Sequence, residues 1–131
     1  MGKTSPTQRS LALVRSRGYT CGVVERWNAH IGIRQDLAGG IDVLYWKAGL
    51  GVTGLQVCAA SGLAAHRTKL LAEPRLREWV RSGAKLEIHA WRKGGPRGKR
   101  KVWSCHEEEL TLAQFQVAAI AALESSGNLG A

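Results

Sequence analysis

The sequence predicts an α/β domain in which a mixed β-sheet is flanked by helices. A chain of 131 residues has room for one domain, and its 44% of apolar residues can form a core. Segments rich in β-forming residues also alternate with segments of helical periodicity. We expect one domain over 1–131 with the order helix, three strands, helices, strand, short strand and last helix.

A helix and three strands are predicted in the first half of the chain. Ser5 and Pro6 suit a helix cap and first turn, so we expect a helix over 7–17 that ends at Gly18. Strands are predicted over 19–27, 41–46 and 52–59, with an irregular connection at 28–40 and a hairpin turn at 47–51. The strand at 52–59 is largely apolar, which is typical of a central strand buried on both faces.

Two helices, two strands and a last helix are predicted in the second half. One helix is expected from Ser61 to about 71 and another from Pro74 to Gly83. A strand over 84–91, a loop over 92–101 and a short edge strand over 102–105 follow. Glutamates at 107–109 favour the N-terminus of a helix, so the last helix is predicted over 107–124, with a frayed tail at 125–131. Its inward stripe would be Leu112, Phe115, Ala119, Ala122 and Leu123.

The charge balance is the strongest indication of a partner. Lys and Arg number 19 against 10 Asp and Glu, giving a net charge of +9, and residues 107–131 contain no Lys or Arg. A domain this basic is typical of proteins that bind a polyanion, and we expect DNA. The loop at 92–101 offers six basic side chains to phosphates: Arg92, Lys93, Arg97, Lys99, Arg100 and Lys101.

The same basic loop has a second interpretation, as a solvated turn. Trp91 and Trp103 flank it, and either tryptophan could stack on unpaired bases or pack in the core. No metal set is predicted from the spacing of His30, His89 and His106, and His89 is expected to be packed or at the surface.

Three cysteines at 21, 58 and 105 form an odd, widely spaced set without a C-x-x-C pair. This pattern argues against a disulfide framework and a zinc site, and it indicates a reducing compartment. No apolar stretch approaches the ~20 residues that a membrane span needs. The first six residues lack the apolar segment of a secretory signal. We therefore expect a cytoplasmic protein with no membrane partner.

Two segments carry a resemblance to a known family: Gly40-Ile41-Asp42-Val43-Leu44 and Leu55-Gln56-Val57-Cys58. With the order of elements over 5–91, they resemble the PD-(D/E)XK nuclease superfamily, and the longer sequence looks like small phage and prophage proteins related to Holliday junction resolvases. The resemblance implies a restriction endonuclease-like αβββαβ core and a metal-dependent endonuclease acting on DNA, with branched or flapped DNA as candidate substrates. It also implies that Asp42 and the residue at 56 bind Mg²⁺ or Mn²⁺, since hard cations prefer oxygen ligands.

The sequence departs from the family motif at two positions. Gln56 stands where an acid is expected; an amide oxygen can ligate a metal but adds no charge. Cys58 stands where a catalytic lysine is expected, and a thiol in a buried strand is better interpreted as a small core residue. Lys69, on the following helix, could replace that lysine, or it could lie on a solvated helix face.

Further residues are candidates around this site. Glu25 or Asp36 could supply the second carboxylate, or each could be a surface charge. His66, three residues before Lys69 and on the same helix face, and Arg34, in the connection at 28–40, are candidates for DNA contacts.

Three functions follow from these patterns. The chain could be a metal-dependent nuclease, a catalytically inactive nuclease-fold DNA-binding protein of a phage or prophage, or a structural component of a nucleoprotein particle. Superfamily resolvases are dimers, and the last helix, with alanines at 118, 119, 121 and 122, could form a homodimer interface or pack on its own sheet.

Overall fold

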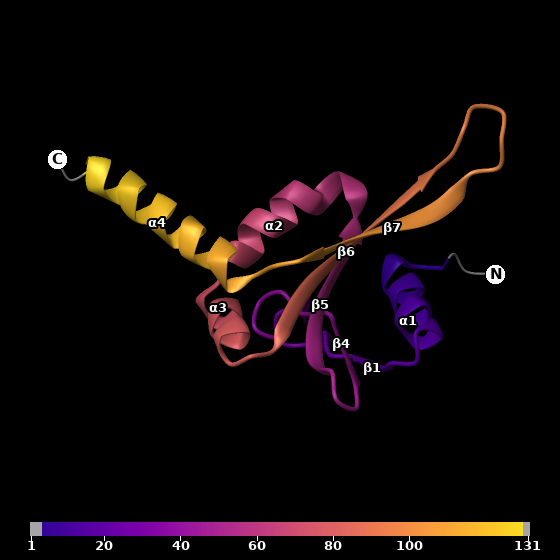
Figure 1. Cartoon of the computed structure of the whole chain (residues 1–131), viewed down its shortest axis with the longest axis horizontal. Coiled ribbons are helices and arrows are strands. Elements are labelled where there is room, and N and C mark those ends of the chain that lie inside the picture. The colour runs from indigo at the N-terminus through magenta and orange to yellow at the C-terminus, as the bar shows by residue number, and fades with distance from the viewer. Residues whose placement is uncertain (1–3, 130–131) are drawn as a thin grey trace.

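The computed structural model describes residues 4–129, with side chains to residue 126, and it confirms the α/β class. A five-stranded sheet has the order β1–β4–β5–β6–β7 (Figure 1). These strands are β1 (Thr20–Val23), β4 (Val43–Lys47), β5 (Gly51–Ala59), β6 (Lys85–Gly94) and β7 (Val102–Glu109). Only β5 and β6 pair in parallel, so the sheet is mixed, as predicted.

Helices cover the two faces of this sheet. Helix α1 (Pro6–Ser16) packs on one face, where its Leu11 and Val14 meet Val43, Tyr45 and Leu55. Helices α2 (Leu63–Leu71) and α3 (Pro74–Arg81) pack on the other face, together with the start of α4 (Leu112–Leu129). The core there is built from Ile41, Leu70, Leu76, Leu86, Ile88 and Phe115, among others. Strand β5 contributes to both cores, which confirms its predicted central place.

The helix ends follow the predicted chemistry only in part. The Ser5 side chain accepts a hydrogen bond from the Gln8 N–H at 3.1 Å, and Gly18, with a φ of +86°, ends the first helix as expected. The predicted cap at Ser61 is wrong. A 3₁₀ turn, η1 (Ala60–Gly62), precedes α2, and Gly62 stands at its cap position without a side-chain hydrogen bond.

The strand predicted over 19–27 is divided in the structure. Strand β1 ends at Val23, and the N–H groups of Val24 and Glu25 both donate to the Asp42 carbonyl, at 2.8 and 3.3 Å, as the chain leaves the sheet. The next residues form a separate two-stranded sheet of β2 (Arg26–Asn28), which takes the end of the predicted strand, and β3 (Ile33–Gln35), which lies inside the region predicted as irregular. We call residues 26–35 the β2–β3 hairpin.

The predicted boundaries at 92–109 are also wrong. Strand β6 continues to Gly94, so Arg92 and Lys93 lie on a strand, and β7 continues to Glu109, so the last helix begins at Leu112. Ion pairs explain why the glutamates stay in the strand: Arg17 binds Glu107 and Arg67 binds Glu108. Strands β6 and β7 together form an arm that extends beyond the body of the molecule (Figure 1).

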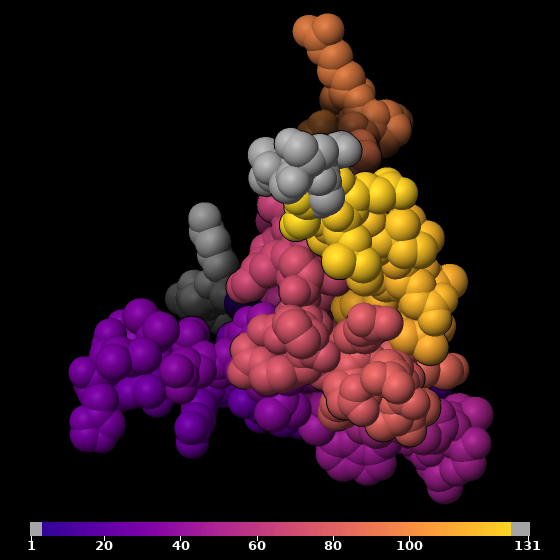
Figure 2. Space-filling view, turned by 90° about the vertical axis from the view of Figure 1, so that its left-hand side faces the viewer, coloured from indigo at the N-terminus to yellow at the C-terminus, as the bar shows by residue number. Residues whose placement is uncertain are grey.

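Helix α4 packs on the molecule only at its beginning. Phe115 is buried and Leu112 and Ala119 are half-buried, whereas Ala122 and Leu123 are exposed, contrary to the predicted inward stripe. The rest of the helix projects away from the sheet (Figures 1 and 2). Of the helices in the described part of the chain, none has the length and apolarity to cross a membrane.

Candidate metal and phosphate site

Three carboxylates meet beside the point where β4 begins. One oxygen from each of Glu25, Asp36 and Asp42 lies within 4.8 Å of the others. All three residues were candidates from the sequence, where Glu25 and Asp36 were alternatives for one ligand. The structure brings both of them to Asp42.

A tight turn explains why two aspartates six residues apart come together. Leu37 and Ile41 exchange backbone hydrogen bonds of 2.9 Å in both directions, so the chain reverses between them. Ala38 and Gly39 make this turn in the left-handed region, with φ of 54° and 79°. Asp36 and Asp42 flank the turn and therefore lie side by side.

The Asp42 carboxylate is held where two strands separate. Pairing between β4 and β5 stops at Val43 and Leu55, so beyond it the Val57 N–H has no partner on β4. The Asp42 Oδ2 atom accepts this N–H at 2.9 Å and the Nε2 group of Gln56 at 2.6 Å. Asp42 thus stabilises the divergence of the strands, and Gln56 orients the carboxylate.

Burial and the close approach of the three carboxyl groups disfavour the ionised form of Asp42. Burial raises the pKa of the Asp42 carboxyl well above its usual range, although the Val57 N–H opposes this, and the neighbouring Asp36 and Glu25 raise it further. The Oε1 atom of Gln56 is also buried, with no hydrogen-bond partner among the described residues. Three carboxylates with one oxygen each within 4.8 Å of the others are a donor set that fits a hard divalent cation such as Mg²⁺ or Mn²⁺.

Cys58 packs into the core beside this cluster. The side chain is buried, and burial, with the nearby Asp42 charge, raises the pKa of its thiol. A neutral thiol in this position cannot act as the ammonium of the family motif, in agreement with its interpretation as a core residue.

A pocket of about 590 Å³ opens beside the carboxylates. Of the three clustered acids Asp36 lines it, and Glu73 is a further acid in its wall. Four basic side chains from β2, β3, α2 and α3 also line it: Arg26, Arg34, Lys69 and Arg75. The Arg34 Nη1 atom lies 3.7 Å from the Glu25 Oε1 atom. Two of these residues, Lys69 and Arg34, were sequence candidates, whereas His66 does not line this pocket.

Arg26 and Arg75 were missed from the sequence. Arg75 is placed by the cap of α3, where Glu73 accepts from both its N–H and its guanidinium, and Gly39 lies directly against this pair. No sequence spacing links residue 39 to residue 75. Arg26 directly follows Glu25, and that adjacency was the one available signal.

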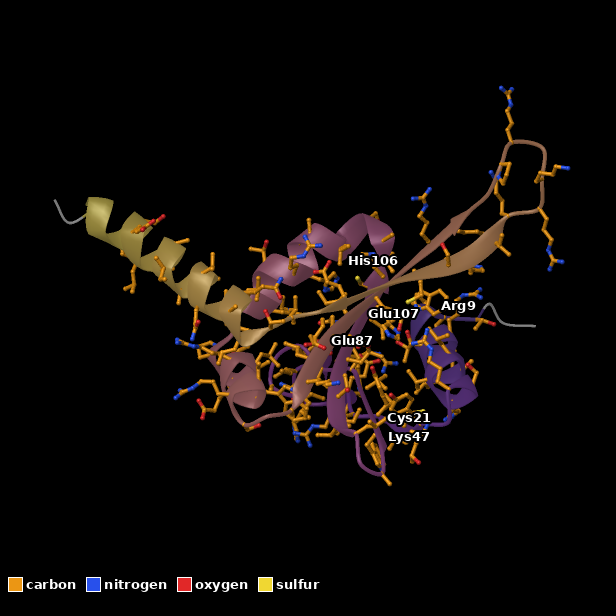
Figure 3. All side chains as sticks on the ribbon, viewed as in Figure 1. Arg9, Cys21, Lys47, Glu87, His106 and Glu107 are labelled. Atoms are coloured by element: carbon orange, nitrogen blue, oxygen red, sulfur yellow. The ribbon has the colours of Figure 1, made fainter. Side chains whose placement is uncertain are left out.

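The six basic residues at 92–101 lie elsewhere. Arg92 and Lys93 are on β6, and the other four follow at the end of the arm, away from the pocket, where nitrogen-tipped side chains spread into solvent (Figure 3). Trp91 is buried and donates to the Ser10 Oγ atom at 2.8 Å, so it packs in the core. Trp103 is at the surface, and the Arg9 guanidinium covers its ring at 4.2 Å from the centroid.

A second cluster, also missed from the sequence, lies on the α1 face of the sheet. Glu87, His89 and Glu107 have ligand atoms within 4.8 Å of one another, and Figure 3 shows the two glutamates near α1. His89 is fully buried and contacts Glu87 at 3.1 Å and Ser10 at 2.9 Å through its two ring nitrogens. Arg17 already neutralises Glu107, so this group is satisfied as a network that ties α1 to the sheet.

Comparison with known proteins gives no match to a family model, to a curated protein or to a solved structure.

Proposed function

We propose that this protein is a metal-dependent endonuclease that hydrolyses phosphodiester bonds in DNA, similar to the PD-(D/E)XK nucleases. The observation that carries the proposal is the group of Glu25, Asp36 and Asp42 beside a pocket lined by basic side chains. Carboxylates that bind a cation, together with cations that bind phosphate, are the two requirements of metal-assisted phosphodiester hydrolysis.

The candidate cation ligands are Glu25, Asp36, Asp42 and the Oε1 atom of Gln56. When bound, Mg²⁺ or Mn²⁺ would neutralise charge on the scissile phosphate and lower the pKa of the attacking water. Burial, and after it the neighbouring Asp36 and Glu25, raises the pKa of Asp42 in the protein alone, and a bound cation would favour the ionised carboxylate against both effects.

The basic residues of the pocket have two roles in this proposal. Arg26, Arg34 and Arg75 would bind the phosphates on either side of the scissile bond, since a guanidinium matches phosphate geometry. Lys69 would orient the attacking water and stabilise the charge that develops on the phosphate. Lys69 comes from α2, which follows β5 in the chain. Near the end of β5, this sequence has Cys58 at the position where the family motif has its lysine.

The arm of β6 and β7 would provide a second DNA contact. Its basic side chains would follow phosphates without reading sequence. Branched or flapped DNA, which offers duplex and junction to two separate contacts, is the substrate we propose. The projecting α4 offers an apolar surface for a homodimer, which suits a two-fold symmetric junction. A reducing cytoplasm, where DNA is present, is the compartment we propose.

One observation favours a second function, a catalytically inactive DNA-binding protein with this fold. Gln56 uses its amide group to donate to Asp42, and Cys58 is buried, so the motif strands contribute one charged group instead of three. Such a protein would keep the phosphate contacts and lose hydrolysis.

Cleavage and binding assays separate the two functions. Four-way junction, flap, single-stranded and duplex DNA would be incubated with Mg²⁺, Mn²⁺ or EDTA. The nuclease predicts metal-dependent cuts that Asp42→Asn abolishes and Lys69→Met reduces by about 10²-fold or more, while Lys85→Met, on a different surface, changes little. Tight, salt-sensitive binding without cuts in either metal would support the inactive protein.

A charge-removal variant tests the arm. Replacing Arg97, Lys99, Arg100 and Lys101 with alanine removes four cations. If each contacts a phosphate, the slope of log K against log salt falls by about 3 to 4, since each contact contributes about 0.9. An unchanged slope would show that the arm does not contact DNA. A variant with alanine at Arg15, Arg77, Arg81 and Lys85, four exposed basic residues outside the arm and the pocket, controls for net charge.

A further inference from the structure

The β2–β3 hairpin carries a tryptophan that the fold does not use. Trp27 is 61% exposed, although a tryptophan side chain is among the most costly to leave in water. The hairpin itself is separate from the main sheet, and residues of this part of the chain stand out from the body of the molecule at the lower left of Figure 2. Trp27 therefore serves neither the core nor the five-stranded sheet.

The strand register connects Trp27 with the carboxylate cluster. Trp27 is directly opposite Arg34 in the antiparallel pair, so the two side chains share one face of the hairpin. The guanidinium of Arg34 reaches to within 3.7 Å of Glu25, one of the three clustered acids. Trp27 is thus the cross-strand neighbour of Arg34, and Arg34 borders the candidate metal site.

The hairpin carries a second basic residue next to Trp27 in sequence. Arg26 precedes Trp27 and lines two cavities: the pocket of about 590 Å³ beside Asp36, and a second of about 210 Å³ that Trp27 itself lines. Arg26 is therefore shared by the carboxylate pocket and the tryptophan. A strand whose phosphate lies in the first pocket would have its next nucleotides beside Trp27.

We propose that Trp27 stacks on an unpaired base of the DNA strand that occupies the carboxylate pocket, so that the site takes substrates with a single-stranded segment next to the scissile phosphate. The inference rests on the proposed DNA function and specifies the substrate class. An aromatic ring beside cations is the combination with which proteins hold single strands, because the cations bind phosphates and any base has a face to stack on. In a paired duplex the bases stack on one another and are not available to the ring.

Charge complementarity favours this occupant over a second copy of the chain. The exposed indole lies across the hairpin from Arg34, and Arg26 precedes it on β2, in a protein whose net charge is +9, so two such surfaces would repel each other. A polyanionic strand is attracted to the same surface.

Binding measured without hydrolysis tests the proposal. Labelled single-stranded oligothymidylate, a flap and a duplex of equal length would be titrated in EDTA and in Ca²⁺, with anisotropy as the readout. Trp27→Ala should weaken binding to the single strand and the flap by about 5- to 100-fold, the range of one base stacked on an aromatic ring, and to the duplex by less than 2-fold. Trp27→Phe should restore most of the loss, because it keeps an aromatic face.

Trp46→Ala is the matched control, since it removes another exposed tryptophan, on β4, that lines neither of the two pockets and is not part of the arm. It should not distinguish single strand from duplex. Circular dichroism and melting of each variant would verify that the main fold is intact, which the separate position of the hairpin leads us to expect.

Several results would overturn the proposal: equal losses on single strand and duplex, no loss on either, or dissociation of a wild-type dimer by Trp27→Ala in light scattering. Failure of the nuclease function is a different result. If no DNA is cut in Mg²⁺ or Mn²⁺ while Trp27→Ala still loses single-strand binding, the stacking site stands and hydrolysis does not. If DNA is cut and Trp27→Ala binds and cuts like the wild type, the nuclease function stands and the stacking site does not.

Discussion

Replacing Gln56 with glutamate puts a fourth carboxylate into the cluster of Glu25, Asp36 and Asp42. The Gln56 Nε2 group donates to Asp42 at 2.6 Å. In Gln56→Glu an acceptor replaces this donor, and two carboxylate oxygens would face each other at that separation. We predict that the substitution destabilises the protein without metal and makes its stability depend strongly on a divalent cation.

The magnitude follows from the proton that such a pair must keep. Burial and the neighbouring carboxyls oppose ionisation of the glutamate introduced at 56, as they already do for Asp42, and holding a proton at pH 7 on a group with an ordinary pKa near 4.3 costs about 3 to 4 kcal/mol. Coulomb repulsion gives a similar bound, about 4 kcal/mol for unit charges ~4 Å apart at an effective dielectric of 20. The free energy of unfolding in EDTA should therefore fall by about 3 kcal/mol, and a cation at 100 times its Kd should restore about 2.7 kcal/mol.

Urea unfolding in EDTA and in Mn²⁺ measures both effects. Gln56→Leu is the matched control, because it also removes the hydrogen bond but adds no charge. We expect Gln56→Glu to gain more stability from Mn²⁺ than the wild type does, and Gln56→Leu to gain less. A Gln56→Glu protein that is as stable as the wild type in EDTA, or that gains no more from Mn²⁺, would refute the interpretation of this cluster as a cation site.

Three further predictions concern stability. Gly40→Ala places a methyl group against the ends of α2 and α3 side chains and should cost about 1–3 kcal/mol in urea unfolding, and a neutral result would show that those side chains move aside. The hydrogen bonds from Arg67 lower the pKa of Glu108 from 4.5 to about 2, so this pair stabilises the fold above pH 4.5 and the contribution is lost as the pH falls towards 2. Because the Arg67 side chain is 36% exposed, we expect about 1 kcal/mol between pH 6 and pH 3, and Glu108→Gln should remove that part of the acid sensitivity in melts across this range. Phe115→Ala should cost about 3–5 kcal/mol and Leu123→Ala less than about 0.5 kcal/mol, and equal losses would show that the outer part of α4 is packed in solution.

Local chemistry predicted most of the fold. The apolar pattern of 52–59 gave the central strand, and the Ser5–Pro6 pair gave the first helix, because burial and capping are decided by neighbouring residues. The division of 19–27 was not predictable in this way. Val23 and Trp27 are both β-formers, and what separates them is the backbone of Asp42, a contact across 18 residues of chain.

Tertiary ion pairs overrode local preference at the glutamates of 107–109. Three acids in a row favour a helix start, but Arg17, at the C-cap of α1, and Arg67, on α2, hold Glu107 and Glu108 along a strand. For the candidate site, the sequence indicated each acid separately. Only the Leu37–Ile41 turn, which depends on two left-handed residues, brings Asp36 and Asp42 together.

The acids of β7 have a consequence for the behaviour of the protein at high concentration. Strand β7 is the last strand of the sheet, so one side of its eight residues pairs with β6 and the other side presents unpaired backbone groups. An edge of this length is a template for a strand from another molecule. Glu109, together with Glu107 and Glu108 in their ion pairs, makes this edge strongly charged, and charged side chains on an edge strand oppose pairing with another strand. The acids that sequence patterns assign to a helix thus protect an open sheet edge from intermolecular association.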